Sequence, residues 1–350
     1  MPKRVLLLST VAILAACSSN VTNATGTGAS TGTGTGGSTS TAQTYTVTWG
    51  PVTVMPGVEN TQCVVKKLGN PTAFHAGTIH NLLNVGSHHL IVYKTNDTVE
   101  QTTPFACQPF TDLAHPEKGT PLMISQKKDD TLSLPAGVAL ALNADQFVRL
   151  ELHYINTSTA PLDVSASSTF VTIPDAEVQN EAGFLFLGDI DISIPPQSMA
   201  TVGPIFAPEP TAVAGSKYFG ITGHEHQWGT DVTVATTTGP TGTDTPIYNV
   251  PGWTWNEPKT VYLDPPVTVP AGGGFRYTCT WNNLSASTVG FGESANNEMC
   301  FFWAYYYPAL TMVNGVSTQG SEVCLHTDQL GSLNACCPGD SLCATIQKHF

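Results

Sequence analysis

Short runs of alternating apolar and polar residues fill the chain from Thr44 onward. Branched and aromatic side chains alternate with polar ones in segments such as YTVTWG, FVRLELHYI and FRYTCTW. A period of two residues is typical of strands with one buried face. Glycine and proline separate these runs at about the spacing found in β-sandwiches. The pattern therefore predicts an all-β protein.

A polar segment, DAEVQNEAG at residues 175–183, interrupts the strand pattern. We place a domain boundary there, with one β domain over residues 44–178 and a second over residues 184–314. Residues 315–350 hold four cysteines in loop-like sequence with little apolar content. This segment is predicted to be a disulfide-stapled tail. A zinc site made by its cysteines and His326 is the alternative.

The first residues have the pattern of an export signal. Lys3 and Arg4 precede a short apolar run that ends Leu-Ala-Ala-Cys, with the cysteine at position 17. The run is too short to span a bilayer. It resembles a bacterial lipoprotein signal over residues 1–17, in which Cys17 is lipidated; an ordinary cleaved signal peptide is the alternative. A lipid anchor implies the cell envelope, and Ser18 and Ser19 favour the outer membrane.

The composition of the chain bears on its linker, its number of domains, its partners and its redox compartment. Residues 18–43 are almost all Ser, Thr, Gly, Asn and Ala, which predicts a flexible linker. The 350 residues are enough for about two domains. A formal charge of −13 argues against a nucleic-acid partner, because such binding needs clustered Lys and Arg. Of nine cysteines, lipidated Cys17 leaves an even number, which suits disulfides in an oxidising compartment.

Five histidines fall in strand-like segments. They are His88 and His89 in GSHHLIVY, His153 in RLELHYI, and His224 and His226 in ITGHEHQWG. Residues i and i+2 of a strand share a face, so the last two can reach one ion. Adjacent histidines point to opposite faces of a regular strand, so ligation by the first two together needs a twist or bulge. Taken alone, each is also explained as a buried, hydrogen-bonded histidine.

The remaining histidines have no motif partner, and they are predicted to be structural or surface residues. They are His75, His80, His115, His326 and His349.

The segment ESANNEMCFFWAYYY places Met299 between an acid and a cysteine in an aromatic strand. A methionine there is usually core filler. However, the order HH, HY, HxH, EMC and YYP resembles that of the copper type II, ascorbate-dependent monooxygenases, the family of dopamine β-hydroxylase and the peptidylglycine α-hydroxylating enzyme. The resemblance covers about residues 45–310. It implies two antiparallel, jelly-roll-like β-sandwich domains that face each other across a solvent-accessible cleft.

The resemblance also implies two copper ions. One would be held by His88, His89 and His153, and the other by the group His224, His226 and Met299. Imidazoles suit copper in both oxidation states, and a thioether favours Cu(I). Three protein ligands leave an open coordination position for catalysis. In the family, the all-histidine site takes electrons from ascorbate, and the methionine-containing site binds dioxygen beside the substrate and hydroxylates a C–H bond.

The cysteines fit the same family. Cys63 with Cys107 and Cys279 with Cys300 resemble bridges of its members. The tail then holds Cys324, Cys336, Cys337 and Cys343, for which three connectivities remain open.

Departures from the family bear on the substrate. Peptide-amidating members place an arginine two residues before HxH and a tyrosine three residues after the motif cysteine, where this chain has Thr222 and Trp303. We therefore expect a small organic substrate rather than a peptide with a carboxy-terminal glycine. Glu225 and Glu298 are candidate partners for a substrate ammonium group, or else carboxylates that support the metal ligands or face solvent. Phe301, Trp303, Trp228 and Trp253 either line an apolar pocket or belong to the core.

The leading hypothesis is a lipid-anchored copper monooxygenase that uses O2 and ascorbate or another reductant. The alternatives are a copper carrier or sensor without turnover, and a structural envelope protein with incidental histidines. The sequence leaves the oligomeric state open.

Overall fold

The computed structural model describes residues 42–107, 115, 118–313, 316–318, 320–328, 333–338 and 340–347. The predicted signal with Cys17, nearly all of the predicted linker, and His349 lie outside the described residues. Within these residues, regular structure is almost entirely β-strand, which confirms the predicted all-β class. No helix in this part of the chain has the length and hydropathy needed to cross a membrane.

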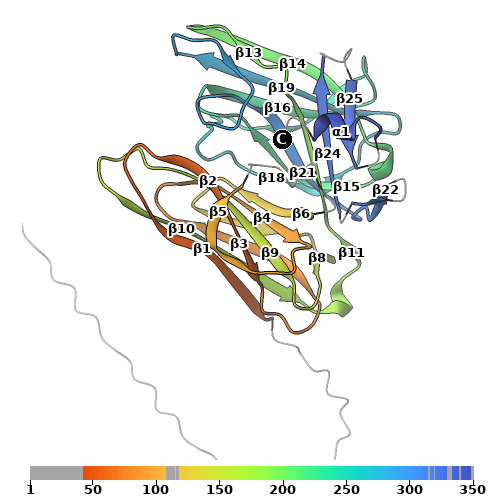
Figure 1. Cartoon of the computed structure of the whole chain (residues 1–350). Helices are drawn as coiled ribbons and strands as arrows, with labels where there is room; N and C mark the ends of the chain where they lie inside the picture. Colours follow the sequence, from red (N-terminus) through yellow and green to blue (C-terminus); the bar gives the residue numbers. More distant parts are fainter. Residues whose placement is uncertain are drawn as a thin grey trace, which may run out of the picture. The chain divides into compact units, whose positions relative to one another are not determined.

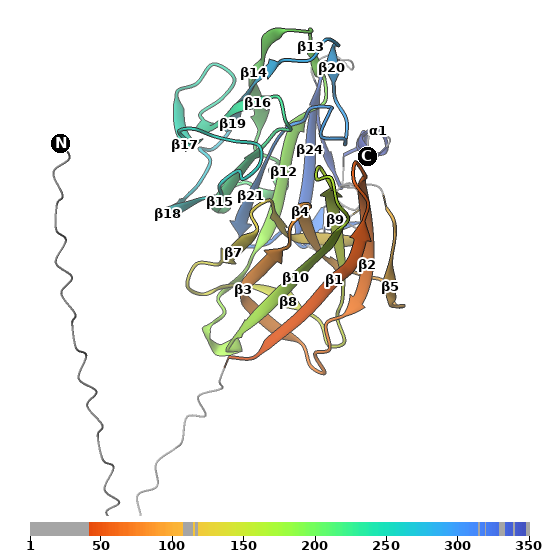
Figure 2. The ribbon, with the colours of Figure 1, turned by 90° about the vertical axis from the view of Figure 1, so that its left-hand side faces the viewer.

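Two sheets form the first half. Their strands are β1 (Thr44–Val54), β2 (Glu59–Lys67), β3 (Phe74–Leu83), β4 (Ser87–Thr95), β5 (Gln101–Ala106), β6 (Gly119–Ser125), β7 (Asp129–Ser133), β8 (Val138–Leu142), β9 (Phe147–Ile155), β10 (Leu162–Ile173) and β11 (Asn180–Glu181). Sheet 1 has the order β1-β10-β3-β8-β11 with β7 beside β3, and sheet 2 has the order β5-β2-β9-β4-β6. Figure 2 shows β1, β10, β3 and β8 as one layer.

The two sheets pack face to face because their alternating apolar side chains share one core. Trp49 of β1 is fully buried, and its ring centroid lies 5.6 Å from that of Tyr154 on β9. The Trp49 indole also donates a hydrogen bond to the Gln62 carbonyl oxygen, 3.1 Å away. Ile79 and Val92, from opposite sheets, are both fully buried. The period-two prediction therefore correctly identified the first sandwich.

The second half adds two main sheets. Its strands are β12 (Gly183–Asp189), β13 (Ser193–Ile194), β14 (Ser198–Pro208), β15 (Lys217–His224), β16 (Gly229–Thr237), β17 (Asp244–Asn249), β18 (Val261–Val267), β19 (Gly274–Asn283), β20 (Val289–Gly290), β21 (Cys300–Tyr307), β22 (Met312–Val313), β23 (Val316–Ser317), β24 (Ser321–Thr327) and β25 (Leu333–Cys337). Sheet 3 has the order β18-β15-β21-β12-β24-β25, and sheet 4 has the order β14-β19-β16-β17. Figure 1 shows these elements in colours from green to blue.

Sheet 3 is buried on both faces, which explains the run CFFWAYYY of β21. Phe301, Trp303 and Tyr305 belong to the same apolar cluster as the first sandwich. Phe302 and Tyr306, which alternate with them, belong to the cluster that sheet 3 forms with sheet 4. A strand buried on both faces needs no polar positions, so its sequence is almost continuously apolar.

The segment predicted as a loop-like tail contributes two strands to sheet 3. β24 runs parallel to β12, and β25 pairs with β24. The central residues Val323 and Leu325 are buried, and their positions alternate along β24. This short pattern lies among cysteines and polar residues, and it gains its partner only from β12, far away in the sequence. A short helix, α1 (Cys343–Ile346), follows.

Four disulfides join these elements. The two bridges implied by the family resemblance, Cys63–Cys107 and Cys279–Cys300, are both present. The tail pairs as Cys324–Cys336 and Cys337–Cys343. Because all four tail sulfurs are used in disulfides, they are not available as thiolate ligands, and the zinc alternative for the tail is wrong.

Candidate metal centre

Three histidines of sheet 2 form the first cluster. His89 on β4 lies directly opposite His153 on β9, and the register shifts between Ser87 and His89. This irregularity brings His88 to the same place, so that the three ring centroids lie 5.0–5.4 Å apart. One candidate ligand atom from each ring lies within 4.8 Å of the other two. The bulge that joint ligation requires is therefore present.

Burial keeps two rings of the first cluster, His88 and His89, uncharged. His88, His89 and His153 are 9%, 2% and 3% exposed. Burial, with a smaller contribution from His153, lowers the pKa of His88 to about 3. The pKa of His89 is lowered well below its ordinary value, again mainly by burial. Neutral imidazole is the form that binds metal ions.

Glu59 orients His153. The His153 Nε2 atom lies 3.0 Å from Glu59 Oε1, and this hydrogen bond is the largest cause that lowers the pKa of Glu59 to about 2. An ionised carboxylate only accepts, so His153 Nε2 donates this hydrogen bond, and Nδ1 is the nitrogen that keeps a lone pair in the neutral ring. Glu59 also accepts a hydrogen bond from the Ala295 N–H, 3.1 Å away. One carboxylate thus links the first cluster to the second half of the chain.

The second cluster begins where β15 ends. His224 is the last residue of β15 and His226 lies two residues beyond it; their ring centroids are 5.1 Å apart and each residue is 1% exposed. Burial lowers the pKa of His226 to about 4 and that of His224 well below its ordinary value. Both rings are therefore neutral at physiological pH.

Each of these two rings is oriented through Nδ1. His226 Nδ1 donates to the Asn297 carbonyl oxygen at 3.2 Å, and His224 Nδ1 donates to Gln126 Oε1 at 3.0 Å. The Nε2 atom of His226 is buried and has no hydrogen-bond partner among the described residues. His88 Nε2 in the first cluster is likewise buried without a hydrogen bond in the described part of the chain. A buried imidazole with one nitrogen oriented and the other left with its lone pair is typical of a metal ligand.

Met299 lies on the same face as the second cluster. His224 is directly opposite Phe301, so these side chains project from one face of sheet 3. Met299 precedes Phe301 by two residues, is fully buried, and belongs to the same apolar cluster as Phe301 and Trp303. The two imidazoles and the thioether suit copper, and zinc has little use for the sulfur. The donor set therefore fits the implied group.

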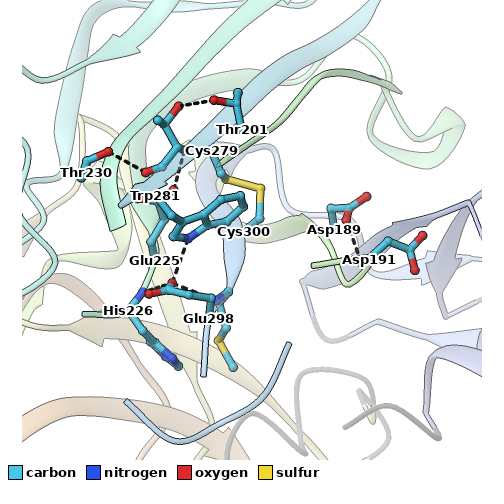
Figure 3. The surroundings of a disulfide bond; sticks show 12 residues. Asp189, Asp191, Thr201, Glu225, His226, Thr230, Cys279, Trp281, Glu298 and Cys300 are labelled. Carbon is cyan, nitrogen blue, oxygen red and sulfur yellow. Dashed lines mark hydrogen bonds between the residues drawn. A yellow bond between two sulfur atoms is a disulfide. The ribbon is translucent and has the colours of Figure 1, made fainter. Parts of the chain in front are cut away.

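Glu298 supports the second cluster by accepting hydrogen bonds from the backbone around His226 and Met299. It is fully buried, and its Oε2 accepts hydrogen bonds from the His226 N–H at 2.8 Å and the Trp281 indole at 2.9 Å. Its Oε1 accepts from the Trp228 N–H at 2.7 Å, and Oε2 also lies 3.3 Å from the N of Met299. Figure 3 shows Glu298 between His226 and Trp281. Because both oxygens are engaged, the structure favours the supporting role for Glu298 over that of an ammonium partner.

Glu225 is directed away from the two rings, since it alternates with His224 and His226. It is fully buried, and its Oε1 accepts a hydrogen bond from the Thr280 N–H at 2.9 Å. Burial raises the pKa of Glu225 well above its ordinary value, with a contribution from Glu298. The Glu225 side chain thus contacts the backbone of β19 rather than the two rings.

The two clusters lie near each other. Electrostatic interactions connect His88 with His226 and His89 with His224. The bonds Glu59 to Ala295 and His224 to Gln126 run between the same two halves.

The four aromatic candidates for an apolar pocket lie in or against the hydrophobic cores, and Thr222 is buried as well. Phe301, Trp303 and Trp253 are buried in the cores, and Trp228 packs partly buried against the second one. Thr222 is buried, with its hydroxyl 2.8 Å from that of Thr260.

The unassigned histidines take part in local contacts. His75 and His80 pair with Asp175 and Asp129 at 2.7 and 2.8 Å, and His326 Nδ1 lies 3.2 Å from the Asn334 side chain. His115 Nδ1 lies 3.4 Å from the Gln347 side chain.

No motif in the sequence indicates three further residues that lie at this centre. Glu59 and Gln126 lie in no motif and reach the histidines only through the fold. Trp255 lies with its ring centroid 5.0 Å from that of His88. Its only sequence signal is the aromatic pair in GWTWN.

Comparisons with known proteins point to the same chemistry. Residues 180–327 match the family model of the copper type II ascorbate-dependent monooxygenase, C-terminal domain. No curated protein sequence matches the chain. Among solved structures, the major capsid protein P2 of bacteriophage PM2 is 8% identical, with a TM-score of 0.36 over 79% of this chain and 100% of that one. The VP2 subviral particle of infectious bursal disease virus is 12% identical, with a TM-score of 0.19 over 77% of each chain.

Both structural likenesses are too weak to carry an argument about fold or function. The family match, in contrast, spans β12 to β24 and includes His224, His226 and Met299. It confirms the resemblance that the order of motifs indicated. Over residues 180–327 the chain therefore matches the C-terminal domain of the copper type II ascorbate-dependent monooxygenase family.

Proposed function

We infer that this protein hydroxylates a C–H bond of a small organic substrate with O2 and an external reductant. The match to the copper monooxygenase family supports this class of reaction. The observation that carries the proposal is the pair of buried histidine clusters, in which burial lowers the pKa values of four rings and one cluster shares its sheet face with Met299.

Each cluster would hold one copper ion. His88, His89 and His153 would bind the first, and His224, His226 and Met299 the second. When bound, copper would supply electron transfer at the first site and activation of dioxygen at the second. Overall, one oxygen atom would enter the C–H bond to give an alcohol. The other would leave as water, with two electrons from the reductant and two protons.

The surrounding residues prepare the ligands for this task. Glu59 accepts a hydrogen bond from a ring N–H of His153, and the Asn297 carbonyl oxygen accepts one from a ring N–H of His226. Each bond fixes the ring tautomer and leaves the opposite nitrogen as the electron donor. Glu298 accepts the backbone N–H of His226, which holds the turn after β15 against the start of β21. These groups set the ligand geometry before any ion binds, which lowers the cost of reorganisation.

The substrate is proposed to be a small molecule without a peptide carboxylate. Thr222 stands where peptide-amidating members place an arginine, and it is buried against Thr260. It therefore offers no positive charge to a carboxylate. Ascorbate, as in the family name, or another small reductant would supply the electrons.

The deciding experiment combines metal analysis with oxygen consumption. The full chain should bind two copper ions, and ascorbate should drive oxygen uptake coupled to hydroxylation in a screen of phenethylamine-like and other small aromatic compounds. Replacing His224 with Ala should remove one copper and the activity. The matched control is His80→Ala, which removes a histidine paired with Asp129 at the surface.

The other hypotheses predict different outcomes. A carrier or sensor would load two copper ions and show no coupled oxygen uptake with any substrate. A structural protein would bind no copper tightly, and His224→Ala would remove none.

The cellular location is a separate proposal. Lipidation of Cys17 would anchor the protein in a bacterial cell envelope, with the sequence after it favouring the outer membrane. Metabolic labelling with a fatty acid should mark the full chain but not the Cys17→Ala variant. Equal labelling of both would contradict the anchor.

A further inference from the structure

A cavity lies at the open edge of the first sandwich, away from the histidines. It has a volume of about 520 Å³ and is lined by residues of β4, β6, β8, β11, β12 and β21. β6 is an edge strand of sheet 2, and β11 is an edge strand of sheet 1. The cavity lies where the edges of sheets 1 and 2 separate, and residues of the second half close one side of it. Its size is that of a site for a small organic ligand.

One wall carries a positive charge and an unused hydroxyl group. Lys94 on β4 and Thr120 on β6 are direct cross-strand partners, so their side chains project from the same face. Lys94 Nζ donates one hydrogen bond, to the Ala141 carbonyl oxygen at 2.9 Å. In the described part of the chain no carboxylate lies within ion-pair distance of it. Thr120 is 3% exposed, and its Oγ1 has no hydrogen-bond partner among the described residues.

In the described residues Thr120 lacks a hydrogen-bond partner, and Lys94 has a carbonyl acceptor and the Glu181 charge nearby but no ion pair. A buried hydroxyl without a hydrogen bond is unfavourable, and so is a partly buried ammonium group without a counter-ion. Burial lowers the pKa of Lys94, and the electrostatic interaction with the exposed Glu181 carboxylate offsets this effect only in part. An anion in the cavity could accept from both groups at once, and charge-assisted hydrogen bonds are the strong ones.

The rest of the lining is divided by polarity. Leu122, Leu140 and Phe184 are buried and line the cavity with apolar surface. The residues Asn96, Asn143 and Glu181 also line it but are exposed. An inorganic anion would leave the apolar surface in contact with water, whereas a carboxylate with an apolar body would cover it.

We propose that this cavity binds a small monocarboxylate, with its carboxylate on Lys94 and Thr120 and its apolar body against Leu122, Leu140 and Phe184. Glu181 gives the cavity a negative charge that disfavours a second carboxylate on the ligand. Lys94 follows His89 by five residues along β4, a span of roughly 17 Å in a strand. The ligand is therefore distinct from the substrate of the histidine clusters, and the site does not depend on the proposed hydroxylation.

The test is direct binding to the copper-free full chain. The probes are 4-phenylbutyrate and hexanoate, their primary amides, the dicarboxylate adipate, and inorganic phosphate, with calorimetry and ligand-observed NMR as the readouts. The monocarboxylates should bind, and their amides, adipate and phosphate should bind at least about ten-fold more weakly.

Variants locate the site. Lys94→Met keeps the aliphatic stem and removes the charge, so it should weaken monocarboxylate binding about ten-fold or more. Thr120→Val removes only the hydroxyl and should also weaken binding. The control is Lys259→Met, which removes an exposed lysine elsewhere and should change nothing.

Three results would overturn the proposal. They are failure of both monocarboxylates to bind at millimolar concentration, equal binding of acid and amide, and unchanged binding in both the Lys94→Met and Thr120→Val variants. Thermal unfolding confirms that each variant is folded. Because no copper or oxygen is used, failure here is separate from failure of the monooxygenase proposal.

Discussion

Glu298 offers the sharpest test of how the second cluster is held. Its two carboxylate oxygens accept from the backbone N–H groups of His226 and Trp228 and from the Trp281 indole, and Oε2 also lies close to the Met299 N–H. The substitution Glu298→Gln keeps the shape of the side chain and replaces one oxygen with an NH2 group. An amide nitrogen cannot accept these bonds.

The expected loss of stability follows from the number of N–H donors that the substitution leaves without an acceptor. In the best orientation the amide oxygen takes the place of Oε2, which serves His226, Trp281 and Met299. The NH2 group then faces the Trp228 N–H, which loses its acceptor. A buried donor without a partner costs about 1–3 kcal/mol. Because two N–H groups also confront each other, we expect the free energy of unfolding to fall by about 2 kcal/mol or more.

The consequence for metal binding is local. Without the bond to Trp228, the turn that carries His226 is less firmly held, so copper at the second cluster should bind more weakly. The first cluster has no contact with Glu298 in the described residues and should keep its copper. Urea denaturation and copper titration under reducing conditions measure the two effects.

Glu225→Gln is the matched control. Its carboxyl group is equally buried and accepts from the Thr280 N–H through Oε1, but it has no hydrogen bond to the backbone of His226 or Trp228 in the described residues, and burial raises its pKa, which favours the neutral form that an amide resembles. It should cost less stability than Glu298→Gln and leave copper binding intact. The positioning role is refuted if Glu298→Gln matches the wild type in both denaturation and copper content, or if the two variants behave alike.

Three further changes test other parts of the structure. Met299→Ile roughly conserves volume, so it should cost less than about 1.5 kcal/mol of stability; oxygen uptake should be lost while the first copper is retained, and loss of both coppers would contradict the two-site assignment. Glu322 is 3% exposed, and burial raises its pKa from 4.5 to about 7. The folded state therefore binds this proton more tightly, and stability falls as the pH rises from 4.5 to 7, by about 3 kcal/mol. Glu322→Gln should remove that loss, so urea denaturation should show it more stable than the wild type at pH 8 but not at pH 4. Replacing both Cys279 and Cys300 with Ser opens a bridge across 21 residues and should cost about 3 kcal/mol by denaturation; an unchanged midpoint would show that the bridge adds nothing.

Local pattern was enough to predict the strands that have one buried face. It misjudged the tail, because β24 lies among cysteines and its partner β12 is distant in sequence. The sequence indicated that His88 and His89 need an irregular strand to act together, and the register shift supplies it. The grouping of His153 with them came from the family resemblance, since β4 and β9 are brought together only by the sheet.

Supporting groups could not be predicted, for a physical reason. A carboxylate that accepts hydrogen bonds from backbone N–H groups has no preferred sequence spacing from its donors. The sequence alone therefore does not decide whether Glu298 binds a substrate ammonium group or supports the metal ligands. Glu59 and Gln126 belong to the first half yet act on the second, through Ala295 and His224. Such contacts depend on the packing of sheets and leave no periodic signal.

These contacts bear on what the family match covers. Residues 180–327 include His224, His226 and Met299, the proposed ligands of the second cluster, but the acceptor for His224 Nδ1 is Gln126, which is outside that range. The face of sheet 3 that carries this cluster is likewise covered by apolar residues of the first half. Without the first half, His224 would lose the bond that fixes its tautomer, and Phe301, Trp303 and Tyr305 would lose their apolar cover. The second histidine cluster is therefore a product of both halves, and its geometry depends on residues that the matched domain does not contain.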